Sequence, residues 1–291
     1  MKRRRFLRAT LAAAAFPPRA RAGDLHLHLR DAIARIPGRV GVYARTMAGG
    51  PPLFTYNAAE SFPTASTIKL LIMLTAYMLE ARRPGTLGER IPTYRRDLIG
   101  GSDFLQSAND GERFTVLQLV RPMIQVSDNS AANALIRHFG AAEITRVGQR
   151  AGLHSTRLAR TFLDYSAIVH HMDNVTTPGD MGELLYAIER GAREEISTVA
   201  SPQACRAMIA IMLGQTDRSK IPAGLPRGIS CANKSGEIEG SRNDIAIVEP
   251  FGDSPYVISV YTKSLQNYSE ADAGIAAISS IVYRALGGSN L

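Results

Sequence analysis

The chain has 291 residues, of which 45% are hydrophobic and 21% are charged. This is the composition of an ordinary globular protein, long enough for one large or two small domains, and no stretch is long and apolar enough to cross a bilayer. The formal net charge is +8, but seven basic residues and no acid lie within residues 1–22, so subtracting them leaves +1 for the rest. The charge therefore gives no reason to expect a nucleic-acid or membrane partner.

Residues 1–22 are predicted to be an export signal. A basic start is followed by the apolar run at residues 10–16 and by small residues that fit cleavage after Ala22. The twin arginines Arg3 and Arg4 are typical of a Tat-type signal, which carries folded proteins across the membrane. The alternatives are a general secretory signal with surplus arginine and a basic disordered tail.

Either export route would place residues 23–291 in a bacterial periplasm or outside the cell. In such an oxidising compartment, a disulfide between Cys205 and Cys231 is allowed but not required. Two buried thiols are an equally good interpretation. A catalytic cysteine is not predicted, because neither residue lies in a recognisable nucleophile setting.

The first predicted element is an amphipathic helix over residues 25–36, where apolar residues recur every three to four positions. Strand-like runs follow at residues 40–43 and 52–56, separated by a turn at residues 49–51. Residues 66–79 are apolar on nearly every side, which indicates a helix buried in the middle of the protein.

The remaining elements are further helices and then strands. Helical patterns with polar loops between them occur at residues 116–126, 129–139, 180–190 and 202–213. Two strands at residues 244–248 and 256–261 surround a turn at 251–255, and a helix at about 271–285 closes the chain.

This order of elements predicts an α/β fold in one domain, residues 23–291. One sheet would be built from both ends of the chain, in a lobe of about residues 23–60 and 215–291, and an all-helical lobe of about residues 61–214 would be inserted. No internal repeat, low-complexity segment or linker marks a second domain.

Ser66 and Lys69 begin the apolar helix and are three residues apart, so both side chains should project from one face. A serine hydroxyl needs a base to remove its proton, and a lysine can be that base only if burial or a second cation lowers its pKa. Lys234 is the candidate for the second cation. Alone, the S-x-x-K pattern is weak, because chance gives roughly one in a chain this long.

Two more motifs follow in order: Ser-Asp-Asn at residues 127–129 and Lys-Ser-Gly at residues 234–236. Alone, the first would be interpreted as a helix N-cap and the second as a surface turn. The three motifs in this order predict instead a serine acyl-transfer site, because each added motif lowers the chance of coincidence.

From about residue 40 to its C-terminus, the chain resembles the class A β-lactamase and penicillin-recognising serine hydrolase family. Besides the three motifs, the matching segments are residues 62–67, 97–102, 123–131, 156–158, 176–178, 221–226 and 240–244. The resemblance implies an antiparallel sheet of about five strands, flanked by the N- and C-terminal helices, beside the helical lobe.

The resemblance also implies catalytic roles. Ser66 would form the acyl-enzyme, and Lys69 would help to deprotonate it. Ser127 would relay a proton to the departing lactam nitrogen, and Asn129 would hold the side-chain amide of the substrate.

On the strand side of the site, Lys234, Ser235 and Arg242 would gather the substrate carboxylate. Gly236 and Glu237 complete the implied substrate-binding set. The backbone N–H of Glu237 and that of the nucleophilic serine would form the oxyanion hole. The family usually has threonine where this chain has Ser235, and the hydroxyl is kept.

The chain departs from the family in the loop that should carry the deacylating glutamate. Counting from residues 156–158 puts Phe162 at the glutamate position and Ser166 at the position of a partner asparagine. Losing a general base typically costs 10²- to 10⁴-fold on the step it serves. Asp164, the only acid in that loop, is two residues out of register; either it replaces the glutamate, or it caps or bridges the loop, for example to Arg160.

No metal or other cofactor is expected. His170 and His171 stand beside Asp173, but a solvated loop is a better interpretation than a zinc site, because adjacent residues rarely converge on one ion. The chain also lacks the G-x-S-x-G elbow of α/β-hydrolases.

The sequence therefore predicts an exported, monomeric serine hydrolase of the class A β-lactamase type, acylated at Ser66 by β-lactams, which it hydrolyses. One alternative is a D,D-peptidase-like or esterase-like hydrolase that acts on cell-wall peptide or another small acyl substrate. The other is a β-lactam-binding protein that acylates without efficient turnover.

Overall fold

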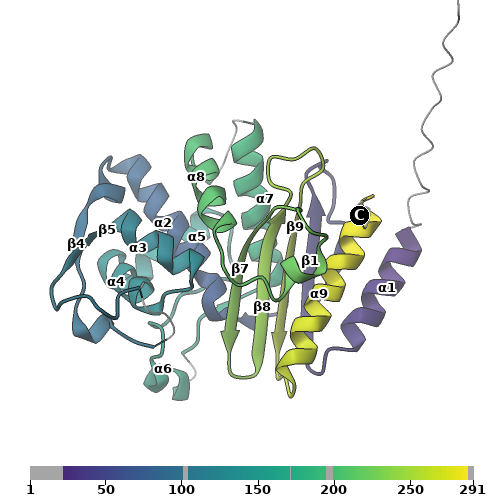
Figure 1. Ribbon diagram of the computed structural model, residues 1–291, viewed down its shortest axis with the longest axis horizontal. Coiled ribbons are helices and arrows are strands. Elements are labelled where there is room, and N and C mark those ends of the chain that lie inside the picture. Colours follow the sequence, from purple (N-terminus) through teal and green to yellow (C-terminus); the bar gives the residue numbers. More distant parts are fainter. Residues whose placement is uncertain (1–21, 101–103, 171, 195–198, 288–291) are drawn as a thin grey trace, which may run out of the picture.

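The computed structural model describes residues 22–100, 104–170, 172–194 and 199–287 (Figure 1). Its centre is a five-stranded antiparallel sheet with the strand order β2-β1-β9-β8-β7. The strands are β1 (Arg39–Thr46), β2 (Phe54–Tyr56), β7 (Cys231–Ile238), β8 (Ser241–Val248) and β9 (Tyr256–Lys263). The predicted α/β class, with a sheet built from both ends of the chain, is confirmed.

Successive side chains of a strand point to opposite faces of the sheet, and here both sets are largely apolar. Both faces of the sheet are therefore buried. Helices α1 (Ala22–Ala34) and α9 (Tyr268–Ala285) pack side by side over one face (Figure 1). One apolar cluster lies between the sheet and these helices, and a second lies on the opposite face. The first cluster includes Val42, Ala44, Ala246, Val248, Ile258 and Val260, whereas the second includes Tyr43, Ile245, Ile247, Val257 and Tyr261.

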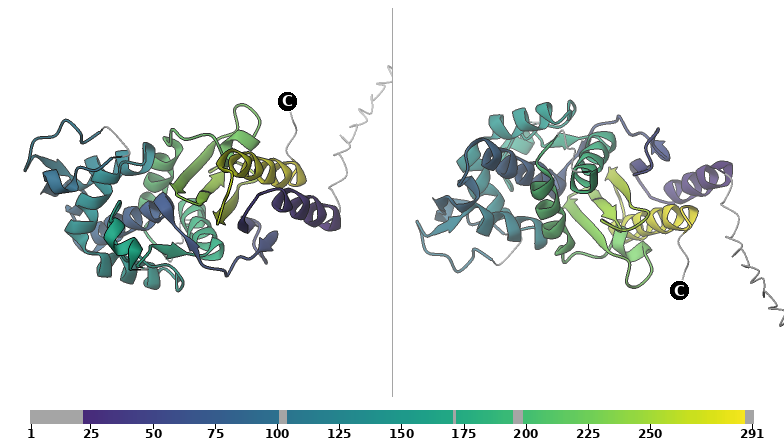
Figure 2. Two further views of the ribbon diagram at one scale, coloured as in Figure 1. Left: turned by 90° about the horizontal axis from the view of Figure 1, so that it is seen from below. Right: turned by 90° about the horizontal axis from the view of Figure 1, so that it is seen from above.

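The second cluster extends into a helical lobe, which lies at the end of the molecule away from α1 and α9 (Figure 2). Helix α7 (Pro178–Glu194) packs on β1 and β9, and α8 (Pro202–Leu213) packs on β7. Helix α2 (Lys69–Arg82) lies at the centre of the lobe, with every side chain from residue 69 to residue 77 buried. This confirms the predicted buried helix.

Shorter elements surround α2. The helices are α3 (Val116–Gln125), α4 (Asn129–Phe139), α5 (Ala141–Arg150) and α6 (Tyr165–Val169). Two small antiparallel pairs are formed by β3 (Phe62–Pro63) with β6 (Val175–Thr176) and by β4 (Arg90–Pro92) with β5 (Arg113–Thr115). The 3-10 turns are η1 (Ala65–Ile68), η2 (Thr86–Gly88), η3 (Arg95–Asp97) and η4 (Ile221–Gly224).

Several expectations concern other parts of the chain. The predicted signal lies outside the described residues except for Ala22, and so does His171. Among the described helices, none is long and apolar enough to cross a membrane. Neither Cys205 nor Cys231 forms a disulfide within the part of the chain that the structure describes, and both are buried, as in the thiol interpretation.

Candidate active site

Ser66 lies in the 3-10 turn η1, one turn before α2, and not in the α-helix predicted from residue 66. The turn is entered through Ala65, whose φ of 45° is in the left-handed region. Thr67 fastens the turn to the sheet: its hydroxyl donates to the Thr64 carbonyl at 2.7 Å and hydrogen-bonds with the Tyr261 hydroxyl at 2.6 Å. The Ser66 hydroxyl is thereby presented beside Lys69, whose Nζ is 3.0 Å from Ser66 Oγ.

The Ser-Asp-Asn motif forms the tight link between α3 and α4. Ser127 has a φ of 57°, and Asp128 caps α4 by accepting the Ala131 N–H at 2.7 Å. The N-cap interpretation of this motif is therefore confirmed, and the same motif also contacts Lys69. Lys69 Nζ lies 2.7 Å from Ser127 O, 3.2 Å from Ser127 Oγ and 2.7 Å from Asn129 Oδ1.

The third motif lies inside strand β7, which the sequence did not predict. Lys234 is fully buried, not on a surface turn, and its Nζ donates to Ser127 Oγ at 3.1 Å and to the Ser235 carbonyl at 2.6 Å. Next to it, a Cβ added at Gly236 would lie 3.0 Å from Ser66 N. The backbone of β7 thus runs directly against the Ser66 turn, where a side chain at residue 236 would crowd the turn.

Burial changes the acid–base properties of both lysines. The pKa of Lys69 falls well below its ordinary value, first because the side chain is desolvated and second because Lys234 is nearby; Asp128 opposes the shift. Burial also lowers the pKa of Lys234 to about 8, against the attraction of Asp244 and Asp217. Burial thus favours the neutral form of both amines, opposed by one carboxylate at Lys69 and by the two named carboxylates at Lys234.

The loop at the expected glutamate position places an aromatic ring over the lysine. The Phe162 side chain is buried, with its ring centroid 4.3 Å from Lys69 Nζ. Asn133 fixes the loop, because its side-chain oxygen accepts the Phe162 N–H at 2.8 Å and its amide donates to the Phe162 carbonyl at 3.2 Å.

Asp164 has a different position. Its carboxylate accepts the Ala167 N–H at 3.0 Å, which caps α6, and it is not among the described residues that line the cavity at Ser66. Arg160 pairs with Asp173, at 2.8 Å between Nη2 and Oδ1. The geometry thus favours the capping alternative for Asp164, with Asp173 as the partner of Arg160.

Ser66 opens into a cavity of about 520 Å³, which Asn129, Phe162 and Glu237 also line. Arg242 lies on β8, in register with Glu237, and stacks on Tyr268, with the guanidinium carbon 3.9 Å from the ring centroid. The predicted site residues other than Asp164 and Arg242 are brought together where β7, η1 and the link between α3 and α4 meet. The sequence register of the loop predicts that an acid is missing at residue 162, but it does not predict that the Phe162 ring covers Lys69.

A serine beside a buried lysine and a second serine, at the junction of an antiparallel sheet and a helical lobe, defines a serine acyl-transfer hydrolase. The model of the β-lactamase enzyme family matches residues 25–286, and the chain therefore belongs to this family. It is a serine hydrolase of the class A β-lactamase type.

Similarity to individual proteins agrees with this placement. The chain is 28% identical over 256 residues to the carbapenem-hydrolysing β-lactamase KPC of Klebsiella oxytoca, covering 86% of this chain and 85% of the relative. It is also 28% identical over 289 residues to β-lactamase OXY-1 of the same organism, covering 96% and 97%.

Two solved structures have the same fold. A β-lactamase from Desulfarculus baarsii superposes with a TM-score of 0.81 at 26% identity, covering 93% of this chain and 100% of that one. An acyl-enzyme complex of penicillin G with a leucine-to-glutamate variant of PBP-A superposes with a TM-score of 0.80 at 27% identity, covering 92% and 98%.

Proposed function

We propose that β-lactams acylate Ser66 and that the resulting acyl-enzyme is hydrolysed slowly. The observation that carries this proposal is the chain of contacts from Ser66 Oγ to Lys69 Nζ, Ser127 Oγ and Lys234 Nζ, with each step between 3.0 and 3.2 Å. Export to the periplasm or outside the cell, through the Tat-type signal at residues 1–22, belongs to the same proposal.

Lys69 acts as the base in its neutral form. Its two nearest neighbours, Ser127 O and Asn129 Oδ1, are both carbonyl oxygens at 2.7 Å, which can only accept hydrogen bonds. A neutral amine has two N–H groups, which these oxygens take, and one lone pair, which remains for the Ser66 proton. Lowering of the Lys69 pKa by burial favours this state.

Acylation then proceeds through a tetrahedral intermediate. Ser66 Oγ attacks the lactam carbonyl carbon as its proton passes to Lys69, and the N–H groups of Ser66 and Glu237 stabilise the oxyanion. The lactam C–N bond breaks, Ser127 gives its proton to the nitrogen, and Lys69 restores that proton to Ser127. The Lys234 ammonium supports this transfer by donating to Ser127 Oγ.

Slow hydrolysis of the acyl-enzyme follows from Phe162. A phenyl ring cannot remove a proton from the attacking water, and Asp164 is engaged in capping α6. The same observation favours, as a second candidate, a D,D-peptidase-like enzyme whose acyl group passes to a nucleophile other than water. A leucine-to-glutamate variant of PBP-A was solved as an acyl-enzyme with penicillin G. The similarity of this chain to PBP-A supports both candidates.

The test is to mix the purified mature protein with a chromogenic cephalosporin and to follow the burst and the steady state. We expect a burst of one equivalent, slow turnover, and a mass increase on the peptide that contains Ser66. The S66A variant should show none of these. A folded wild-type protein that gives neither burst nor adduct would refute the proposal, and fast steady-state turnover would refute its second part.

A further inference from the structure

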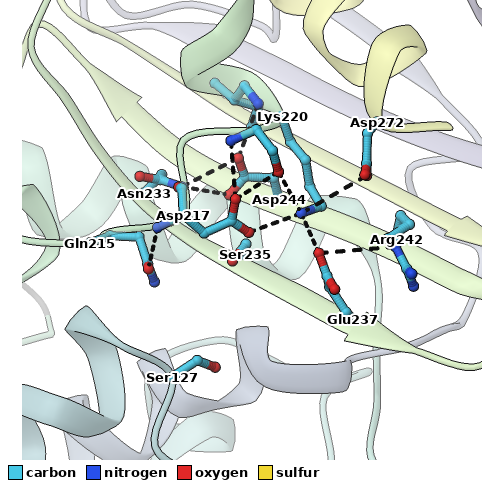
Figure 3. A network of polar contacts seen from close by, with 12 residues as sticks. Ser127, Gln215, Asp217, Lys220, Asn233, Ser235, Glu237, Arg242, Asp244 and Asp272 are labelled. Atoms are coloured by element: carbon cyan, nitrogen blue, oxygen red, sulfur yellow. Dashed lines mark hydrogen bonds and ion pairs between the residues drawn. The ribbon is translucent and has the colours of Figure 1, made fainter. Parts of the chain in front are cut away.

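A polar network lies beside β7, next to the acylation site (Figure 3). At its centre is Lys220, whose side chain is fully buried and whose Nζ is 2.6 Å from Glu237 Oε1 and 2.9 Å from Asp217 Oδ2. Asp272 Oδ1 lies 3.9 Å from the same nitrogen. This lysine is therefore held among carboxylates of the chain itself.

Arg242 and Ser235 are both expected to gather a substrate carboxylate. Each of them lies near one of the carboxylates that hold Lys220, Arg242 near Glu237 and Ser235 near Asp217. Arg242 Nε is 3.9 Å from Glu237 Oε1, and the Arg242 side chain is only 16% exposed. Burial raises the pKa of Asp217, but hydrogen bonds from Ser219, Ser235 and Lys220 outweigh it and hold the pKa below its ordinary value. The Asp217 carboxylate, with its pKa lowered, thus lies against Lys220 at the buried end of this network.

Glu237 is the member of this network that a substrate can reach. It lines the cavity that contains Ser66, and its side chain is 50% exposed, whereas that of Lys220 is fully buried. A substrate carboxylate that approaches Arg242 would have to displace the Glu237 carboxylate or be bound against its charge. Like charges in contact oppose binding strongly in a partly buried site.

We propose that Glu237 is a specificity-determining residue, whose carboxylate lies between Lys220 and Arg242 and so opposes a substrate carboxylate at Arg242. The site therefore favours amide and ester substrates whose leaving group carries no negative charge. This inference rests on the proposed acylation of Ser66. It also implies that β-lactams, whose carboxylate must compete with Glu237, acylate the wild-type protein more slowly than they acylate a variant without this charge.

The test uses two thioester substrates with the same acyl group, one releasing thioglycolate and the other thioglycolamide. Release of the thiol gives kcat/KM for each in the mature wild-type protein, in E237Q and in E239Q. E239Q is the matched control, because Glu239 lines the same cavity and carries the same charge but pairs with neither Lys220 nor Arg242 in the contacts of the described residues. Differences in leaving-group reactivity cancel, because the ratio of the two values is compared between proteins.

The quantity compared is kcat/KM for the carboxylate-bearing substrate divided by kcat/KM for the neutral substrate. We expect E237Q to raise this ratio by about tenfold and E239Q to change it by less than about twofold. The substitution keeps the backbone N–H of residue 237, and E237A serves as a second variant if E237Q does not fold. An unchanged ratio in these variants, or an equal rise in E239Q, would overturn the inference alone. Failure of both thioesters to acylate folded wild-type protein that a chromogenic cephalosporin still acylates would overturn the inference alone. Failure of the thioesters and the cephalosporin together would overturn the proposed function and this inference with it.

Discussion

At the scale of single residues, the proposed acylation depends on two buried amines, one neutral and one protonated. Burial and the nearby Lys234 lower the pKa of Lys69, whereas Asp244 and Asp217 partly restore that of Lys234. Acylation needs the first amine neutral and the second protonated. The rate should therefore rise with pH as Lys69 loses its proton and fall as pH passes the Lys234 pKa of about 8.

The variant K234R tests the alkaline side of this profile. Arginine stays protonated at every accessible pH, so the fall in acylation rate near pH 8 should disappear or move far upward while the acidic limb remains. The measurement is the second-order acylation rate constant of wild type and K234R between pH 5 and 10. An alkaline limb at the same pH in both proteins would show that another group is responsible.

Phe162 allows a second prediction, in which a carboxylate is placed where the ring now covers Lys69. F162E should speed hydrolysis of the acyl-enzyme by about 10²- to 10⁴-fold, because a base within reach of the attacking water is restored. F162Q is the control: it loses the same buried ring but gains no base. Single-turnover decay of the adduct, followed by mass spectrometry, should be fast only in F162E, and equal rates in the two variants would contradict the explanation.

At the scale of elements, α6 depends on the residue before it. Asp164 accepts the Ala167 N–H, and asparagine is an equally good N-cap, whereas alanine is not. D164N should therefore leave both hydrolysis of the acyl-enzyme and stability unchanged. D164A should lower the free energy of unfolding by about 1 kcal/mol. Denaturant unfolding and adduct decay check both, and a large loss of hydrolysis in D164N would instead make Asp164 the base.

At the scale of the whole molecule, apolar periodicity was sufficient to predict most elements. The helices at residues 129–139 and 202–213 are observed with those bounds, because amphipathic stripes and caps determine them locally. Strand β7 was missed because polar side chains occupy its buried positions. Asn233 donates to Asp244, 11 residues along the chain on the neighbouring strand, and Lys234 donates to Ser127, 107 residues away, both at 3.1 Å.

The site shows the same division between local and long-range information. The three motifs predicted which side chains converge, and their spacing predicted the contact between Ser66 and Lys69. The ring of Phe162 over Lys69 and the pairing of Glu237 with Lys220 could not be predicted, because both depend on how separate segments pack. Departures from a family pattern show where to look but not what replaces the lost group.

The two cysteines give a prediction for the whole molecule. Cys205 belongs to the apolar cluster of the helical lobe, whereas Cys231 belongs to the cluster beneath α1 and α9, on the opposite face of the sheet. A disulfide between them would require the sheet to open. Burial also raises the pKa of the Cys231 thiol, so little reactive thiolate forms.

The melting temperature of the mature protein should therefore be the same with and without a reducing agent. A thiol reagent should detect two thiols in unreduced, denatured protein and almost none in the native state. The double variant C205A/C231A is the control, since it cannot form a disulfide and should be equally insensitive to reduction. A lower melting temperature of the wild type alone under reducing conditions would mean that the two thiols are joined and that the strands of the sheet are not arranged around them as described.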